Sequence, residues 1–293
     1  MTKIYLFTFC VLFGKETKKN LLNALYLLIN SLEKTNNYEL HVFTNLDINI
    51  NNNNIKFCEY FNNDIKFCEY FNNDKSYFSQ EWLNLSYSQE WLNLSYNKLN
   101  IYKYLYNKYQ INFLWIDLDT IVTSNIEYIN DVKSYFVENG GISTYPNDLF
   151  TNKKLCVPRN RYIQGNIWKL NIDLYNDLIT SFKEILNNKF HLRYDGQDLF
   201  NYHIYYKLHG KLDENNIYIA GLNYKPETIN GLSIWSLEGN THATHNGLNN
   251  MYYHNNKLKS KFYPDKEIHF VSFTFSTLNK LINVNKFKEL FNK

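Results

Sequence analysis

The sequence predicts an α/β fold with a mostly parallel central sheet and helices on both of its faces. Short apolar runs alternate with amphipathic segments over residues 3–122, in the strand–helix–strand order that is typical of parallel sheets. Hydrophobic residues make up 44% of the 293-residue chain, so a substantial core is available. Because no segment rich in Pro, Gly or Ser divides the chain, we expect a single domain over residues 1–293.

The first half begins with a strand at 3–9, which lacks the small-residue cleavage site of a secretory leader. A helix at about 16–34 follows, because leucine and isoleucine residues recur on one helical face. These residues are Leu21, Leu22, Leu25, Leu28, Ile29 and Leu32. A strand at 39–44 and a helix at about 89–108 come next, and this helix leads into the apolar run 112–122.

Two perfect tandem repeats lie between the second strand and the second helix. IKFCEYFNND at 55–64 recurs at 65–74, and SQEWLNLSY at 79–87 recurs at 88–96. Two such repeats do not resemble a solenoid, whose units diverge and number three or more. We expect one copy of each to be redundant for the fold, with the extra residues looping out at the surface.

The second half is less regular. The predicted elements are strands at 140–145, 162–170, 217–221 and 268–273, and helices at about 172–187 and 196–209. Lysines near the end of the chain are typical of a solvated helix face, and they allow at most a peripheral contact with a membrane surface. These lysines are Lys280, Lys286, Lys288 and Lys293.

Charge and cysteine content argue against several classes of protein. The chain has 31 basic and 28 acidic residues, a net charge of +3 that does not favour nucleic acid as a partner. The four cysteines form no CxxC pair, so neither a disulfide framework nor a zinc site is expected, and a reducing, cytoplasmic location is the default. No apolar segment reaches the length of a membrane span.

The most informative residues are Asp117 and Asp119, which stand in the apolar run NFLWIDLDTIV at 112–122. A run of this length predicts one buried strand. Because successive strand side chains point to opposite faces, both carboxylates should share one face and Leu118 the other. Two carboxylates at the end of a hydrophobic strand are costly unless a cation offsets their charge. We therefore expect Mn²⁺ or Mg²⁺, hard ions that share oxygen ligands with substrate phosphates.

Five segments resemble glycosyltransferase family 8, the glycogenin and bacterial galactosyltransferase group, whose members have the GT-A fold. The run at 112–122 is similar to the DxD segment of this family, and YNKL at 96–99 is similar to its donor-side helix. IQGNIWKLN at 163–171 is similar to its NAGVLLIN strand. DGQDLFN at 195–201 is similar to its DQDxLN helix start, and THNG at 244–247 to its HFxG motif.

The resemblance implies a metal-dependent glycosyltransferase that moves a sugar from a nucleotide-diphosphate donor, such as a UDP-sugar, to a glycan or protein acceptor with retention of configuration. The nucleotide-sugar half would span about 1–125 and the acceptor-side half about 126–293. The implied metal ligands, for Mn²⁺ or Mg²⁺, are Asp117, Asp119 and His245. The implied substrate-binding residues are Thr8, Lys98, Asp117, Leu118, Gln164, Gly165 and Asn166. The implied catalytic residues are Gln197, Asp198 and Asp195.

Two other functions stay open at this point. Asp117 could be the nucleophile of a phosphohydrolase of the haloacid dehalogenase type, with Asp119 as acid/base. The motif lies far from the N-terminus, however, and no later strand ends in the acidic Gly-Asp pair that would complete such a site. Ile163 and Gly196 replace an Asn and an acidic residue of the family pattern, so a sugar-nucleotide or glycan binder without turnover also fits.

The motifs also have structural interpretations. An Asp-x-Asp segment can be a capped turn whose carboxylates bind backbone amides. Gln197 and Asp198 could satisfy the free amides of a helix N-terminus. Three other histidines compete with His245 as the third metal ligand, namely His242, His254 and His269.

Overall fold

The structure is a computed structural model of the chain. It describes residues 3–12, 17–60, 89–138, 163–187, 195–207, 217–220, 228–229, 232–233, 237–238, 242–261, 264–273, 278 and 280–291.

The elements follow one another in this order. The first are β1 (Ile4–Cys10), α1 (Lys18–Leu32), β2 (Tyr38–Thr44), β3 (Ile55–Glu59) and α4 (Gln89–Tyr109). Next are β4 (Leu114–Ile116), β5 (Thr120–Val122), the 3₁₀ helix η2 (Glu127–Asp131), β6 (Ser134–Glu138) and β7 (Ile163–Lys169). Then come α5 (Ile172–Asn187), α6 (Asp195–Asn201), the π-helix η3 (Tyr202–Lys207), β8 (Ile217–Ala220), β9 (Thr228–Ile229) and β10 (Leu232–Ser233). The last are β11 (Leu237–Glu238), β12 (His242–Thr244), the 3₁₀ helix η4 (His245–Asn250), β13 (Met251–His254), β14 (Lys257–Ser260), β15 (Phe270–Ser272) and α8 (Asn285–Phe291).

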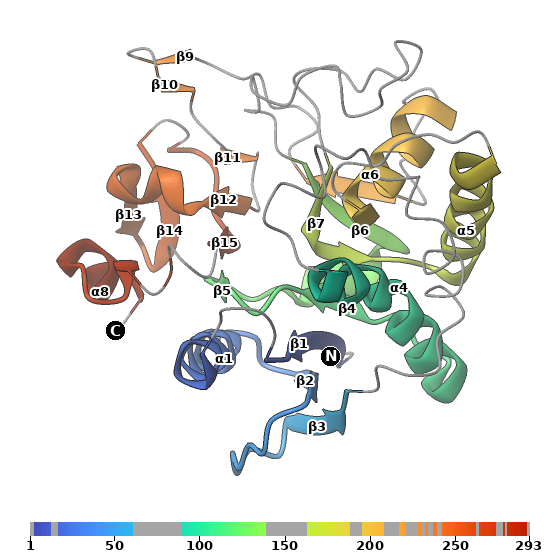
Figure 1. Ribbon diagram of the computed structural model, residues 1–293. Helices are drawn as coiled ribbons and strands as arrows, with labels where there is room; N and C mark the ends of the chain where they lie inside the picture. The colour runs from blue at the N-terminus through green and yellow to red at the C-terminus, as the bar shows by residue number, and fades with distance from the viewer. Residues whose placement is uncertain are drawn as a thin grey trace.

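The central sheet has seven strands in the order β3-β2-β1-β4-β7-β6-β8 (Figure 1). All of them run parallel except β7, which is antiparallel to both of its neighbours. The prediction of a mostly parallel sheet is therefore confirmed. The connections from β1 lead to β2 and β3 on one side, whereas β4 lies on the other side of β1. The strand order thus reverses between β1 and β4, where open α/β sheets bind their ligands.

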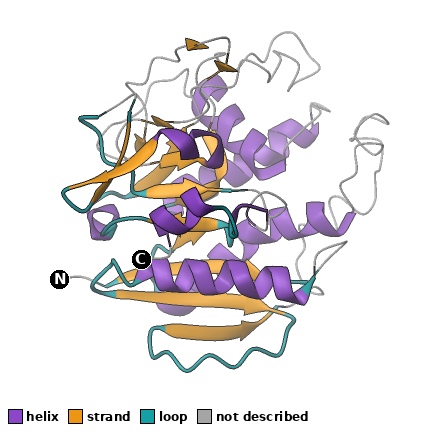
Figure 2. Ribbon diagram, turned by 90° about the vertical axis from the view of Figure 1, so that its left-hand side faces the viewer, coloured by secondary structure: helices purple, strands orange, loops and turns teal. Residues whose placement is uncertain are grey.

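Helices cover both faces of this sheet, as expected. On one face Phe7 and Phe9 of β1 pack with residues of α4, α5 and α6. On the other face Ile4, Leu6 and Cys10 of β1 pack with α1, α8 and a second, smaller sheet. One strand serves both cores because its alternate side chains point in opposite directions. Figure 2 shows α1 running alongside the first strands of the sheet.

Helix α1 forms where its apolar periodicity predicts. Thr17 caps its N-terminus, with Oγ1 accepting a hydrogen bond from Asn20 N at 3.2 Å. Leu25 and Leu28 are fully buried against the sheet. Near its end, Ser31 Oγ accepts a hydrogen bond from Val122 N at 2.9 Å, which fastens the helix to β5.

The run at 112–122 is not one strand, so that prediction is wrong. β4 belongs to the central sheet, while β5 is the edge of a four-stranded sheet in the order β11-β12-β15-β5. The residues of both strands are buried, so the apolar composition continues through the turn between them. Neither Gly nor Pro marks that turn, and only its two charged residues distinguish it from a strand.

Other predictions have mixed outcomes. The first copy of IKFCEYFNND contributes β3, and the second copy of SQEWLNLSY opens α4. Residues 61–88 between them lie outside the described residues, as does the strand expected at 140–145. The strand β6 and the hairpin of β13 and β14 were not predicted. Within the described ranges, no helix combines the length and apolar character that a membrane crossing requires.

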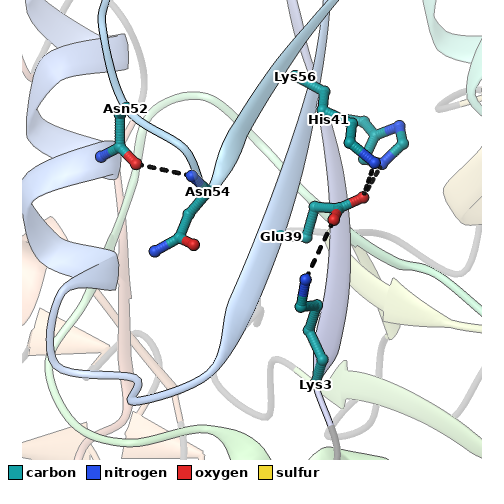
Figure 3. A network of polar contacts seen from close by, with 6 residues as sticks. All are labelled: Lys3, Glu39, His41, Asn52, Asn54 and Lys56. Carbon is teal, nitrogen blue, oxygen red and sulfur yellow. Dashed lines mark hydrogen bonds and ion pairs between the residues drawn. The ribbon is translucent and has the colours of Figure 1, made fainter.

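A buried acidic residue lies at the opposite end of the central sheet, where the parallel strands begin. Glu39 on β2 accepts hydrogen bonds from Lys3 Nζ at 3.3 Å, His41 Nε2 at 2.8 Å and Lys56 Nζ at 2.5 Å (Figure 3). Desolvation by burial raises the pKa of Glu39, but these three donors outweigh it and hold the pKa at about 2, below its usual 4.5. The carboxylate therefore ties together the starts of β1, β2 and β3.

Replacing Glu39 by glutamine is expected to lower the free energy of unfolding by about 2 kcal/mol at pH 7. The full pKa shift is worth about 3 kcal/mol, and the partial exposure of Lys3 and Lys56 reduces it by screening. Because the folded pKa is depressed, this stability is present above about pH 4.5 and is lost as the pH falls toward 2. In urea unfolding, the difference between wild type and variant should shrink from pH 7 to pH 3. The exposed Glu33→Gln is the control, and an equal Glu39→Gln difference at both pH values would contradict the prediction.

Candidate functional site

Asp117 and Asp119 form the turn that links the two sheets. Asp117 directly follows β4 and Asp119 directly precedes β5. The turn closes through a hydrogen bond from Thr120 N to Asp117 O at 3.1 Å. Asp117 thus stands at the carboxyl end of β4, beside β1, which is the ligand-binding position of an open α/β sheet.

The two acids are partly exposed, while Leu118 between them is buried in the apolar cluster on the α1 side. The two acids thus lie on the opposite side from Leu118, as expected, although the segment is a turn and not a strand. Backbone hydrogen bonds hold both ends of the turn. Asp117 N donates to Asn166 O at 2.8 Å, and Phe273 N donates to Asp119 O at 3.0 Å. The positions of the acids therefore depend on β7 and on the residue after β15.

The Asp117 side chain is held by two donors. Its Oδ1 accepts a hydrogen bond from Lys98 Nζ at 3.0 Å and another from Trp115 Nε1 at 2.9 Å. The Lys98 ammonium also lies over the Trp115 ring, 4.6 Å from the centroid. Burial raises the pKa of the Asp117 carboxyl, and Lys98 and Trp115 oppose that rise. Because a carboxylate has a second oxygen, Asp117 can keep both donors and still coordinate a cation through Oδ2.

Strand β7 departs from regular pairing close to this turn. Its register against β6 shifts between Phe136 and Val137, so residues 165–167 have no pairing partner on β6. The Gly165 N–H instead donates to Gln197 Oε1 at 2.8 Å. Such bulges often occur beside active sites, where they change the direction of a side chain. The bulge joins the Asp117 turn, through Asn166, to the start of α6.

A second side chain of α6 holds the same strand. Asn201 Oδ1 accepts a hydrogen bond from Ile163 N at 2.8 Å, and its Nδ2 donates to Ile163 O at 2.9 Å. Gln197 and Asn201 are four positions apart on the helix, so they fasten α6 to β7 on one face. Asp195 and Asp198 belong to this helix, but the structure describes only their backbone and not their side chains.

Replacing Gly165 by alanine is expected to destabilise the protein by about 1–3 kcal/mol, because a Cβ there would lie 2.7 Å from Gln197 Cγ. The displaced Gln197 would also lose its hydrogen bond to the Gly165 N–H. Urea unfolding of a double-mutant cycle tests the cause. Gly165→Ala should cost clearly less in a Gln197→Ala background, whereas additive costs would show that another contact is responsible.

The strand register places the backbones of Asp119 and His245 just beyond the same end of one row of paired residues. In the four-stranded sheet Thr120 pairs with Ser272, and Ser272 pairs with Thr244. Asp119 precedes the first residue of this row and His245 follows the last, so their backbones are about two strand spacings apart, roughly 10 Å. An aspartate and a histidine can bridge that separation through a shared cation. The side chain of His245 lies outside what the structure describes.

The same register separates the competing histidines from the acids. His242 pairs with Phe270, at the other end of these strands. His269 is adjacent to that end, where its carbonyl accepts a hydrogen bond from Thr123 N at 2.8 Å. His254 ends β13 in the separate hairpin. Of these four histidines, the strand register therefore favours His245 as the one beside the turn.

The residues at the turn suit a hard divalent cation. Among side chains that the structure describes, no three of His, Cys, Asp and Glu gather as a metal-binding group. The candidate set that the sequence implies joins the carboxylates of Asp117 and Asp119 with the imidazole of His245, whose side chain is not among those described. Oxygen ligands with one imidazole are compatible with Mn²⁺, and two carboxylates with Mg²⁺.

The other predicted binding residues are not all brought to this turn. Lys98 and Asn166 bond Asp117 directly, and Gly165 lies next to Asn166 on β7. Thr8 is fully buried in β1, and its Oγ1 has no hydrogen-bond partner within the described ranges. Gln164 is partly buried on β7, and within the described ranges it makes no hydrogen bond to the acids.

The structure adds two residues that were not predicted. Trp115 is two positions before Asp117 in the sequence. Side chains at this spacing in an extended segment share one face, so the indole lies on the same side as the Asp117 carboxylate. This i, i+2 spacing could have identified it. Ser272 bonds the side chains of Asn166 and Thr120. No sequence signal identifies Ser272, because its contacts come from strands more than a hundred residues away.

No protein-family model matches the chain, and no curated protein matches it. Function is therefore inferred from the sequence motifs and from the geometry of this site.

Proposed function

We propose that the protein is a metal-dependent glycosyltransferase of the GT-A fold that uses a nucleotide-diphosphate sugar, most simply a UDP-sugar, and a glycan or protein acceptor. The supporting observation is the Asp117–Asp119 turn at the carboxyl edge of the parallel sheet, with Lys98 held on its first carboxylate. Paired acids beside an ammonium group match a diphosphate that is bridged to the protein by a cation.

The chemistry of the reaction explains these residue types. Breaking the bond between sugar and diphosphate leaves negative charge on the diphosphate. Mn²⁺ or Mg²⁺ held by Asp117, Asp119 and His245 would supply Lewis-acid stabilisation of that charge. Lys98 supplies a second positive charge from α4, and its side chain is 19% exposed, so a substrate phosphate can reach it.

The sugar side of the reaction would fall to α6 and β7. Gln197 presents a fixed amide, because Gly165 N–H holds its Oε1. A positioned carbonyl of this kind can stabilise positive charge on the sugar ring without acting as a nucleophile. Asp195 and Asp198, in the first turns of α6, are the proposed ligands of sugar hydroxyls. The acceptor would then attack from the face that the diphosphate leaves.

Release of nucleoside diphosphate from a panel of sugar nucleotides tests this function. We expect release from at least one UDP-sugar with Mn²⁺, little with EDTA, and no cleavage of p-nitrophenyl phosphate. Cleavage of p-nitrophenyl phosphate would favour a phosphohydrolase with Asp117 as nucleophile. Metal-dependent binding of UDP without any release would favour a binding protein. Failure to bind UDP with Mn²⁺ would overturn both sugar-nucleotide functions.

A further inference from the structure

One buried hydroxyl connects the two sheets next to the Asp117–Asp119 turn. Asn166 Nδ2, on β7 of the central sheet, donates to Ser272 Oγ at 2.6 Å. Ser272 Oγ and Thr120 Oγ1, on β15 and β5 of the smaller sheet, are 3.2 Å apart and share a hydrogen bond. Ser272 and Thr120 are 6% and 1% exposed, so water does not replace these bonds easily.

Two members of this network, and the residue after the third, are also bonded to the turn through the backbone. Asn166 O accepts the hydrogen bond from Asp117 N, and Thr120 N donates to Asp117 O. Phe273, the residue after Ser272, donates its N–H to Asp119 O. A change in the Ser272 contacts therefore moves the strands that hold the two acids. The members of buried hydrogen-bond networks of this kind are coupled, since the loss of one member changes the bonding of its neighbours.

We propose that Ser272 is a positioning residue that sets the spacing of Asp117 and Asp119, and thereby the affinity of the site for its cation. This inference rests on the proposed function. Asn166 anchors the Asp117 end of the turn to β7, whereas β15 anchors the Asp119 end. The Ser272 hydroxyl is a side-chain link between these two anchors. It acts on the metal through the acids and does not touch the reacting atoms.

Ser31 provides a matched control. It is also a buried serine, 7% exposed, and its Oγ accepts a hydrogen bond from Val122 N at 2.9 Å on the same strand β5. It donates to Leu28 O within α1 at 2.7 Å. Ser31 therefore resembles Ser272 in burial and in its contact with β5, but its bonds lie at the end of the strand away from the acids.

The experiment compares Ser272→Ala, Ser272→Thr and Ser31→Ala. The measurements are the Mn²⁺ concentration that gives half-maximal UDP-sugar cleavage, Mn²⁺ binding by calorimetry, and the Tm. We expect Ser272→Ala to raise the half-saturating Mn²⁺ concentration about tenfold, in the range of substitutions beside metal ligands. Ser272→Thr, which keeps the hydroxyl, should restore most of the affinity. Ser31→Ala should leave Mn²⁺ affinity unchanged, even if it lowers the Tm as much as Ser272→Ala does.

The outcomes separate this inference from the proposed function. If Ser272→Ala lowers only the Tm, or if Ser31→Ala changes Mn²⁺ affinity equally, Ser272 is a structural residue and the inference fails while the function stands. If the wild type neither binds Mn²⁺ nor cleaves any donor, the proposed function fails and the inference with it. Should Ser272→Ala not fold, Thr120→Val removes the other hydroxyl at constant shape, and unchanged Mn²⁺ affinity in that variant refutes the inference.

Discussion

Replacing Asp119 by asparagine is expected to lower donor cleavage by about 10³-fold while the protein remains folded. Asparagine keeps the shape and one oxygen of the side chain but removes its charge. The cation would then lose one of its two carboxylates, and less charge on the leaving diphosphate would be stabilised. The fold should survive because the carbonyl of Asp119, not its side chain, accepts the Phe273 N–H.

Steady-state release of UDP over a range of Mn²⁺ concentrations tests this expectation, with circular dichroism to verify folding. Asp47→Asn is the control, because Asp47 is an exposed aspartate that follows β2 at the same edge of the sheet. Asp117→Asn should also abolish turnover, but it additionally weakens the contacts with Lys98 and Trp115. Near-normal cleavage by Asp119→Asn with Mn²⁺ present would show that this carboxylate is not a metal ligand.

Elements with strong periodicity were predictable from the sequence. The helix expected at 16–34 is Lys18–Leu32, and the one expected at 172–187 has those bounds in the structure. In both, apolar side chains repeat at the helical period and pack on one face of a sheet. The strand at 3–9 was equally clear, because a parallel strand buried on both faces reads as a nearly continuous apolar run. The strand at 39–44 was predicted at the right place although Glu39 and His41 interrupt its apolar residues.

The same property explains the error at 112–122. Two buried strands of different sheets follow one another across a short turn, and their composition does not reveal the change of sheet. The β13–β14 hairpin was missed despite a usable signal. Its two-residue turn is Asn255-Asn256, with φ of 51° and 59°. Asparagine tolerates this left-handed conformation, which tight hairpins require.

The candidate site was predictable only where its residues are close in the sequence. The acids of the turn and the motif at 195–201 can be recognised as short patterns, and Lys98 was suggested by the resemblance alone. The contact of Lys98 with Asp117 and Trp115 depends on the packing of α4 against the sheet. The alignment of Asp119 with His245 depends on the pairing of β12, β15 and β5. Such tertiary pairing leaves no periodic trace in the sequence.

Replacing Lys98 by methionine is expected to lower the rate of donor cleavage by about 10²–10³-fold, because the leaving diphosphate loses a fixed positive charge. Lys98 opposes the rise in the pKa of Asp117 that burial causes, so its removal raises that pKa further. Because a metal binds the carboxylate and not the carboxylic acid, Mn²⁺ binding should be lost at a higher pH as the solution is acidified. Titration of Mn²⁺ binding from pH 8 to pH 5 measures this shift.

Lys103→Met is the matched control for Lys98→Met, since Lys103 lies on the same helix and contacts only the rings of Tyr106 and Tyr175 among the cation–π pairs described. It should change neither the rate nor the pH dependence. An unchanged rate and an unchanged pH dependence in Lys98→Met would mean that the ion pair with Asp117 is only a structural contact.

A double variant separates the electrostatic role of Lys98 in stability from its role in the reaction. Lys98→Met alone leaves the Asp117 carboxylate with one donor fewer, which should cost about 1–3 kcal/mol of unfolding free energy. Adding Asp117→Asn removes the uncompensated charge, so the double variant should regain much of that stability. It should nevertheless remain inactive, because it lacks both the Asp117 carboxylate that would bind the metal and the ammonium group of Lys98. Recovery of stability together with activity would show that the pair acts by holding the fold, and that the diphosphate is bound elsewhere.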